Sequence, residues 1–343
     1  MKNKLLSFLI VFFLISILSC EKNKSDNEVL PRQLTSTNSD SRCFWSPNGE
    51  YIAFLSSRNT YNPMASIVIF ELWVMDRDGS DQRPLLLFDE LYESTNVVHV
   101  SWSMNSDALL AQIYTPGGSE IWKVSIIGNK TRLSSLDYWA ERPKYSPDGL
   151  KVSFIIQGPN STQGSPVYRL YSANPDLSDT VLIEKGLIGD YDWLYNSEGV
   201  IYSLYNRTNE NFDLWKSSTD GTEKLRLSET SEDEETLTCS YDGNYISYSD
   251  YNAVYITPLD IFNSSLLLDS ARLPKWIPNR NLILLSRLQT QDNSTWTESW
   301  IVDINGDVIM KIEEGNFSEV AFSSSGDYFT YTKEGNIWLD KLP

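Results

Sequence analysis

Ionisable side chains recur at one fixed place in a repeated segment of this chain. Seven times an apolar stretch leads into a tight turn, most clearly of the Ser-Pro-Asn-Gly or Ser-Pro-Asp-Gly kind. The residue just before each turn is usually aromatic. Three residues before it, five of the seven copies carry an ionisable side chain, which could bind a charged ligand or transfer a proton. These five are Arg42, His99, Arg142, Asp192 and Glu319, and the remaining copies have Thr236 and Leu273. We expect the set to line one mouth of a central channel, as candidate binding residues.

The rest of the sequence gives little sign of catalysis. His99 is the single histidine, whereas zinc sites and imidazole acid–base pairs generally use more. We find no Gly-x-Ser-x-Gly nucleophile elbow, no phosphate-binding glycine loop and no paired-cysteine metal motif. The segment 76–81 resembles a calcium loop but lacks the glutamate twelfth position, so it is interpreted as a hairpin turn. We therefore predict no catalytic residue, no metal and no cofactor.

The repeat itself predicts the architecture. Its clearest turns are residues 45–49 and 145–149. Weaker copies lie at 102–106, 195–199, 239–243, 276–280 and 322–326, and the fourth copy is aligned on Tyr195. Each unit divides into four short strands rich in aromatic and β-branched residues, and the third strand usually carries a tryptophan or tyrosine. Such units bury their faces only by stacking on one another.

The two ends of the repeat region are complementary. The seventh unit stops after its third strand, whereas residues 29–36 look like a fourth strand with no unit before it. Pairing these ends would close a ring and protect an exposed sheet edge. Residues 29–343 then give about 45 residues per unit. The sequence predicts an all-β, seven-bladed β-propeller closed by its N-terminal strand, with six blades as the alternative if the degenerate sixth unit folds differently.

At this point a family resemblance can be stated. A Trp-Ser-Pro-Asp-Gly-like turn, a strand, an aromatic strand, an Asp-Gly turn and an Arg-Leu-Thr-like ending together resemble the TolB-type β-propeller repeat. That repeat also occurs in tricorn protease and in the prolyl oligopeptidase and dipeptidyl peptidase families. The resemblance implies a propeller. The sequence departs from TolB in lacking its α/β domain, and from the peptidases in lacking the hydrolase domain that supplies their nucleophile. A propeller lyase with a metal site built from several histidines is excluded by the single His99.

The N-terminus has the features of an export signal. Lys2 and Lys4 precede an apolar run that ends in Ser19-Cys20, a pattern too short for a comfortable membrane span. The segment 17–20 resembles the bacterial lipoprotein box. We expect residues 1–19 to be a signal peptide, Cys20 to be lipidated, residues 20–28 to be a flexible tether and residues 29–343 to form the propeller. A plain signal peptide is the alternative.

Charge and cysteine content narrow the partners. Removal of the signal changes the formal net charge from −18 to about −20, which disfavours nucleic acid and anionic membrane surfaces. We therefore expect membrane attachment only through the N-terminal lipid, in the bacterial cell envelope, on the periplasmic side or on the outer membrane. Cys43 and Cys239 lie in non-adjacent units, and we expect buried free thiols rather than a disulfide.

The long connections between second and third strands gather on one face with the segments that enter the inner strands. Binding residues commonly lie on long loops carried by a rigid scaffold, and aromatic residues dominate binding hot spots. The candidate anchors on this loop face are Tyr61, Tyr138, Trp139, Tyr191 and Trp296.

Three functions fit these features. The first is a non-enzymatic, lipid-anchored envelope propeller that binds a protein or glycan through its loop face. The second is a glycan-active enzyme that uses carboxylates such as Asp192 and Glu319 at the channel mouth. The third is a sensor whose channel holds a small anion between Arg42 and Arg142.

Overall fold

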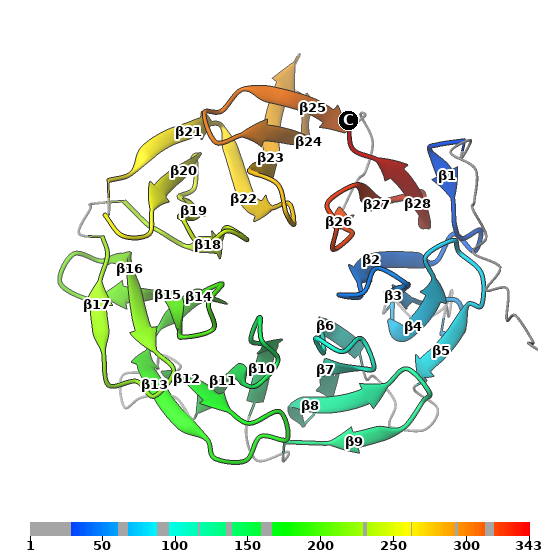
Figure 1. Ribbon diagram of the computed structural model, residues 1–343, viewed down its shortest axis with the longest axis horizontal. Coiled ribbons are helices and arrows are strands. Elements are labelled where there is room, and N and C mark those ends of the chain that lie inside the picture. The colour runs from blue at the N-terminus through cyan, green and yellow to red at the C-terminus, as the bar shows by residue number, and fades with distance from the viewer. Residues whose placement is uncertain are drawn as a thin grey trace, which may run out of the picture.

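Seven four-stranded antiparallel sheets surround one axis (Figure 1). The computed structural model describes residues 29–343 except 61–67, 88–95, 116, 135–138, 159–166, 229–231, 262, 292–293 and 313–318, together with the side chains of 288, 290–291 and 294–296. The predicted signal peptide, Cys20 and tether lie outside the described residues. The described residues form strands, turns and bends, and among them no helix long and apolar enough to cross a membrane is found.

The blades follow one another along the chain. Blade one is β2 (Asp40–Trp45), β3 (Tyr51–Ser56), β4 (Glu71–Asp76) and β5 (Arg83–Leu86); blade two is β6 (Asn96–Trp102), β7 (Ala108–Thr115), β8 (Gly118–Ser125) and β9 (Lys130–Arg132). Blade three is β10 (Trp139–Tyr145), β11 (Val152–Gly158), β12 (Val167–Ala173) and β13 (Val181–Gly186); blade four is β14 (Ile188–Trp193), β15 (Gly199–Asn206), β16 (Asn211–Ser218) and β17 (Lys224–Arg226). Blade five is β18 (Thr236–Cys239), β19 (Tyr245–Ser249), β20 (Ala253–Pro258) and β21 (Ser265–Asp269); blade six is β22 (Ala271–Trp276), β23 (Leu282–Gln291), β24 (Ser294–Asp303) and β25 (Val308–Ile312). Blade seven is β26 (Ala321–Phe322), β27 (Tyr328–Lys333) and β28 (Asn336–Lys341), completed by β1 (Arg32–Gln33).

The repeated turn joins the first and second strands of each blade. In blade one, the Ser46 amide donates to Tyr51 O at 3.0 Å and the Gly49 amide donates to Ser46 O at 2.9 Å. Ser46 Oγ also donates to Asn48 Oδ1 at 2.7 Å. Gly49 has φ 70°, in the left-handed region that glycine enters at little cost. Blade three repeats these bonds with the same residue types: the Gly149 amide donates to Ser146 O at 2.9 Å and Ser146 Oγ donates to Asp148 Oδ1 at 2.6 Å.

The hydrophobic core lies between neighbouring blades. Leu55 and Val74 of blade one are fully buried in one cluster with Leu109 and Ala111 of blade two. Similar clusters join the other sheets around the ring, because each sheet has two apolar faces that need a neighbour.

Buried carboxylates reinforce the third strands. In three blades an indole Nε1 donates to an acidic residue two positions earlier on the same strand. These bonds are Trp73 to Glu71 (3.3 Å), Trp122 to Glu120 (2.6 Å) and Trp300 to Glu298 (2.8 Å). Lys311 on the fourth strand of blade six also lies 2.7 Å from Glu298 Oε1. The Glu-x-Trp pattern thus links third and fourth strands away from the axis.

The predicted ring closure is confirmed. β1 pairs antiparallel with β28 through Arg32↔Leu339 and Gln33↔Trp338. The Leu34 amide donates to Ile337 O at 2.7 Å, and the Ile337 amide donates to Thr35 Oγ1 at 3.0 Å.

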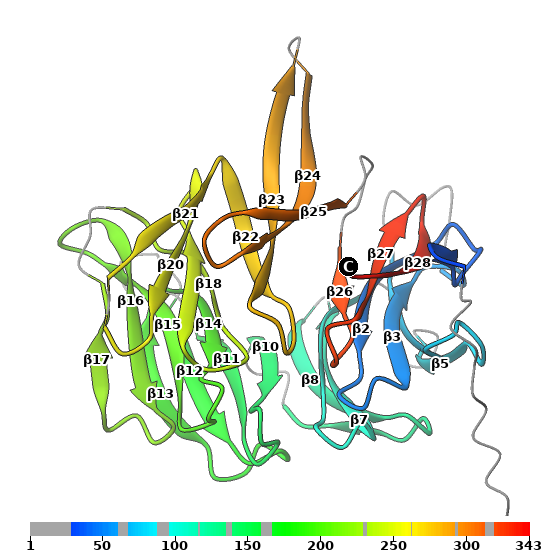
Figure 2. The same cartoon turned by 45° about the horizontal axis from the view of Figure 1, so that its top comes forward.

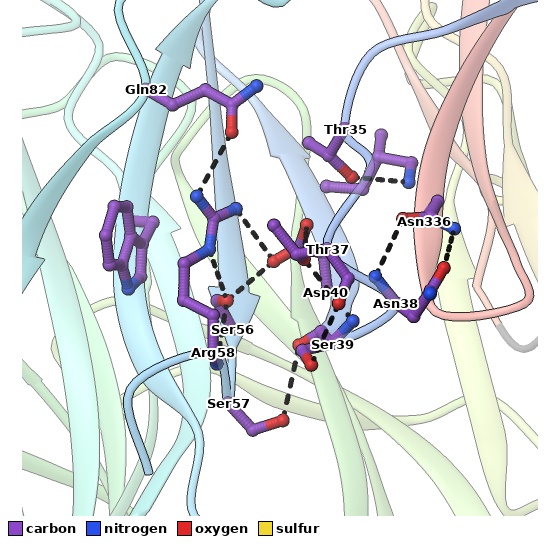
Figure 3. Close-up of polar contacts among 12 residues, drawn as sticks. Thr35, Thr37, Asn38, Ser39, Asp40, Ser56, Ser57, Arg58, Gln82 and Asn336 are labelled. Carbon is purple, nitrogen blue, oxygen red and sulfur yellow. Dashed lines mark hydrogen bonds and ion pairs between the residues drawn. The ribbon is translucent and has the colours of Figure 1, made fainter. Parts of the chain in front are cut away.

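A polar network extends this closure into blade one (Figure 3). Asn38 and Asn336 exchange bonds of 2.9 and 2.7 Å. The side chain of Asp40 is fully buried and lies 2.9 Å from Arg58 NH2. Ser56 and Thr37 each donate to the Asp40 carboxylate at 2.6 Å. The N-terminal segment is therefore bonded to both blades that it joins.

Blade six departs from the repeat by its long second and third strands. β23 and β24 stay paired from Leu282↔Asp303 to Gln291↔Ser294. β22 pairs with β23 only as far as Arg287, and β25 pairs with β24 only from Ser299 onward. The far half is a two-stranded hairpin that stands clear of the ring (Figure 2).

Candidate ligand-binding channel

The innermost strand of each blade faces the channel, and its bulges decide which side chains reach the axis. Pairing between the first and second strands shifts register in blades one, two, three, four and six. Arg42 and Arg142 lie at two of these shifts with φ 48° and 51°. A bulge re-aims the side chain it carries. The local strain therefore places two guanidinium groups toward neighbouring blades.

Both arginines are bonded to the protein. Arg42 Nε lies 2.6 Å from Glu319 Oε1 in the preceding blade, and Arg42 NH1 donates to Val98 O in the following blade at 3.1 Å. Arg142 NH1 donates to Gly189 O at 2.7 Å and lies 3.7 Å from Asp190 Oδ1. These contacts connect blades but use only part of the five N–H donors of each guanidinium, so an anion held between Arg42 and Arg142 stays a hypothesis.

Asp192 belongs to a different level of the channel from the one predicted. In blade four the Leu194 amide donates to Gly199 O and the Ser197 amide donates to Leu194 O, both at 2.9 Å. This is the bonding pattern of the blade-one turn, so Trp193 rather than Tyr195 is the turn-preceding residue. Counting back three residues from Trp193 gives Asp190. The sequence alignment was wrong here because the blade-four turn lies two residues earlier.

Two sets of channel residues can now be defined. The loop-side set lies three residues before the turn-preceding position: Arg42, His99, Arg142, Asp190, Thr236, Leu273 and Glu319. The turn-side set lies one residue before it: Phe44, Ser101, Lys144, Asp192, Thr238, Lys275 and Ala321. Sequence reasoning missed Asp190, Lys144 and Lys275; the correct register of blade four would have revealed Asp190.

In the turn-side set, Lys144 and Asp192 form a satisfied pair. Lys144 Nζ donates to Tyr191 O at 2.6 Å and to Asp192 Oδ1 at 3.3 Å. Asp192 Oδ2 accepts a bond of 3.1 Å from Thr238 Oγ1 and one of 3.4 Å from the Cys239 amide. Burial alone would lower the pKa of Lys144, but the carboxylates of Asp192 and Asp190 outweigh it and raise the pKa. Lys144 therefore stays charged.

The field around His99 is positive. Burial lowers the pKa of its imidazole to about 3, and the charges of Lys144, Arg142 and Arg42 act in the same direction. Burial likewise raises the pKa of Glu319, although Arg42 and Lys275 oppose this. His99 is neutral at physiological pH.

A cavity of about 700 Å³ opens among the turns that join first and second strands. Lys144, Asp192, Thr238 and Lys275 lie in its wall. Its aromatic lining residues are Trp45, Trp102, Tyr145, Trp193, Tyr195, Tyr241, Trp276 and Phe322. This volume is typical of small-ligand pockets. Because the first-to-second turns and the second-to-third loops lie at opposite ends of the strands, the cavity is on the face opposite the predicted loop face.

The predicted loop-face anchors have mixed outcomes. Trp139 begins β10, is 36% exposed and packs edge-on against Tyr114 with ring centroids 5.2 Å apart. Trp296 lies in β24 opposite Gln289 on the projecting hairpin. Tyr61 and Tyr138 lie outside the described residues.

Tyr191 is not a surface anchor. Its side chain is fully buried, and its hydroxyl donates to Arg142 O and, at 3.1 Å, to Ser153 O. Its ring lies under Lys144 Nζ, 4.9 Å from the centroid. The inward-facing position of Tyr191 on β14 makes it a core residue that ties blade four to blade three.

Cys43 and Cys239 do not form a disulfide. Cys43 is buried and Cys239 is partly buried, and both are free thiols. Burial raises the pKa of Cys43 to about 12, so this thiol is unreactive at neutral pH. Within the described part of the chain, no group of three or more His, Cys, Asp or Glu side chains is placed to hold a metal ion.

The fold and channel define a seven-bladed β-propeller of TolB-like architecture. Oligogalacturonate lyase from Vibrio parahaemolyticus is similar over 93% of this chain and 95% of its own, with a TM-score of 0.72 and 12% identity. Another oligogalacturonate lyase structure, in complex with manganese, covers 91% of this chain and 92% of its own with a TM-score of 0.67 and 12% identity. TolB from Acinetobacter baumannii matches with a TM-score of 0.53 and 16% identity, over 76% of this chain and 62% of its own.

These likenesses establish the fold. They confirm the resemblance to TolB-type propellers that the repeat predicted, at the level of architecture. No protein-family model matches the chain. No curated protein matches it either. Structural neighbours include both an enzyme and TolB, so function must be argued from this chain's own residues.

Proposed function

We propose that this protein is a non-enzymatic, lipid-anchored propeller of the bacterial cell envelope that binds a protein or glycan partner through its loop face. The observation that carries the proposal is the hairpin of blade six. Between Arg287 and Ser299, the described residues of its two strands pair with each other and with no third described strand. An isolated two-stranded ribbon is marginally stable in water, and its open edges are templates for strand addition. A protein partner would cover those edges.

The bonding of the channel supports binding over catalysis. Asp192 is held by Lys144 and Thr238, and Glu319 Oε1 is held by Arg42. A general acid–base pair needs groups that can reach a substrate and change protonation. The second candidate, a glycan-active enzyme, is supported by Glu319 alone: its pKa is raised, and its buried Oε2 has no hydrogen-bond partner among the described residues.

The proposed location rests on the N-terminal sequence. A lipoprotein-like Ser19-Cys20 follows the apolar signal, and the described chain begins at the outer strand of blade seven. Changing Cys20 to Ser should abolish labelling by radioactive palmitate and release the protein from the membrane fraction. Persistent labelling of this variant would contradict lipidation at Cys20.

A pull-down from envelope extract tests the binding face. In one variant, residues 289–296 are replaced by Asn-Gly, so that the paired residues Leu288 and Thr297 flank a two-residue turn. The control changes Tyr195 and Tyr241 to Ala; both are exposed on the opposite face. We expect the hairpin variant to lose the recovered partner and the control to retain it, with melting temperatures near that of the unmodified protein. Recovery of the same partners by both variants would exclude the hairpin as the binding element.

A further inference from the structure

The turn-face cavity, the cavity of about 700 Å³ among the first-to-second turns, has in its wall one lysine without an ion pair in the described part of the chain. Lys144 and Lys275 occupy equivalent positions of the turn-side set, in blades three and six. Lys144 has two acceptors, one of them a carboxylate oxygen. Lys275 Nζ donates only to Val320 O at 3.2 Å, and it has no carboxylate within ion-pair distance among the described residues. An ammonium group has three donors. Lys275 therefore has donors available to the channel.

Accessibility favours a ligand at Lys275 over a structural role. Its side chain is exposed, although it lies in the wall of the channel. The exposed part of Lys275 therefore faces the channel. Burial among protein atoms lowers the pKa of Lys275, and Glu319 only partly offsets this. An anionic group in the cavity would stabilise the charged form.

The carboxylates that could repel an anion are already engaged. Asp192 is bonded to Lys144 and Thr238. Asp148, at the turn of blade three, accepts bonds from Ser146 Oγ at 2.6 Å and the Leu150 amide at 3.0 Å. Glu319 is paired with Arg42. The lining thus balances two lysines against two aspartates, and Lys275 is the one whose charge has no carboxylate at ion-pair distance among the described residues.

The remaining wall suits a flat apolar group. Tyr195 and Tyr241 are 48% and 39% exposed and form an edge-on pair with centroids 6.4 Å apart. Trp276 is 1% exposed and its Nε1 has no hydrogen-bond partner among the described residues. By contrast, the equivalent indoles donate to protein oxygens: Trp45 to Thr330 Oγ1 (3.1 Å), Trp102 to Phe44 O (2.9 Å) and Trp193 to Lys144 O (3.3 Å). Aromatic faces bind planar rings by offset or edge-on packing.

We propose that the turn-face cavity binds a small ring-bearing carboxylate, with its anion on the Lys275 ammonium and its ring against the aromatic wall. This site lies on the face opposite the loops, so it does not depend on the partner-binding proposal. A volume of about 700 Å³ accommodates such a molecule. A charge-assisted bond fixes one end of the ligand, while the exposed rings of Tyr195 and Tyr241 pack against the other.

Calorimetric titration and ligand-observed NMR with 2-naphthoate and 2-naphthamide test this site in the mature protein. We expect the carboxylate to bind and the neutral amide to bind at least about tenfold more weakly, since a hydrogen bond to a charged group is lost. Lys275→Gln should weaken 2-naphthoate binding by about tenfold or more, and Lys275→Arg should restore much of it. Lys123→Gln removes an exposed lysine on β8 and is the matched control, with no expected effect.

Three outcomes would overturn the proposal. One is equal affinity for 2-naphthoate and 2-naphthamide. Another is unchanged 2-naphthoate affinity in Lys275→Gln with its near-UV circular dichroism intact. The third is no binding of 2-naphthoate to the unmodified protein at millimolar concentration. Recovery of the same partners by both pull-down variants would contradict the hairpin proposal and leave all three measurements unaffected, so failures of the two proposals are distinguishable.

Discussion

Lys144 and Asp192 hold blades three, four and five together at the channel wall. The ammonium bridges to Tyr191 O and the Asp192 carboxylate, which in turn accepts from Thr238. Lys144→Met would remove the ammonium that balances the Asp192 carboxylate and donates to Tyr191 O, leaving Asp192 with Thr238 and the Cys239 amide. Because the pair is about three-quarters buried, we expect the free energy of unfolding to fall by about 1–3 kcal/mol. Urea unfolding measures this, and Lys275→Met, which breaks no ion pair, is the control. Equal losses in both variants would contradict the contrast drawn between these lysines.

His99 makes stability depend on pH. Burial and the nearby Lys144 and Arg142 lower its pKa from 6.5 to about 3. Between about pH 6.5 and pH 3, His99 is therefore protonated in the unfolded state and neutral in the folded state. The free energy of unfolding is unaffected by His99 above about pH 6.5 and falls as the pH drops toward 3. Between about pH 7 and pH 5 the unmodified protein should lose about 1–2 kcal/mol more than His99→Gln. Urea unfolding at both values checks this. Parallel losses in the two proteins would exclude His99 as the cause.

Only some of the channel residues could be predicted from the sequence. Arg42, His99, Arg142 and Glu319 were found because they share one spacing from a recognisable turn. Asp192 was assigned to that level only because the alignment used Tyr195, and hydrogen bonds that the alignment could not see place the turn at Leu194. Lys275 was overlooked because it is distinguished by having no ion pair among the described residues, and only coordinates reveal this.

At the scale of elements, the turns between first and second strands carry contacts between blades. Gly326 has φ 74°, and a Cβ there would lie 2.1 Å from Pro278 O of the preceding blade. Gly128, between β8 and β9, has φ 89° with nothing within 4 Å of a Cβ. Gly128→Ala should cost about 1 kcal/mol of unfolding free energy from backbone strain alone. Gly326→Ala should cost about 2–4 kcal/mol, because a steric clash is added. Chemical denaturation compares them, and similar losses would show that the Gly326 turn shifts at little cost.

Element boundaries followed from the sequence wherever the repeat was regular. The inner and second strands of blades one and three coincide closely with the alternating segments that flank their turns. The length of the blade-six hairpin could not be predicted, since the polar stretch after Leu288 has the composition of a loop. The bulges at Arg42 and Arg142 were also beyond sequence reasoning, because arginine has no preference for positive φ.

For the whole molecule, the ring and its closure were predictable because both depend on counting. Seven turn-bearing units, the last one strand short, and one surplus strand at the N-terminal end predict a single arrangement, and β1 pairs with β28 as expected. The position of the cavity was not predictable. It depends on how far seven inner strands stand apart at the turn end, a distance set by the packing of whole sheets.

Removing the closing strand tests how much of the ring's stability depends on this pairing. Deleting residues 29–36 removes β1, the Leu34–Ile337 backbone bond and the buried Leu34 side chain, which packs with Ile337 and Leu339. We expect the free energy of unfolding to fall by at least about 3 kcal/mol from lost burial and hydrogen bonds. The exposed edge of β28 should also promote concentration-dependent self-association, visible by analytical ultracentrifugation, because unpaired strand edges recruit other strands. The matched control deletes the eight tether residues 21–28 and should change neither property. A monomer with an unchanged unfolding midpoint after loss of residues 29–36 would show that the other six blades hold the ring without its closing strand.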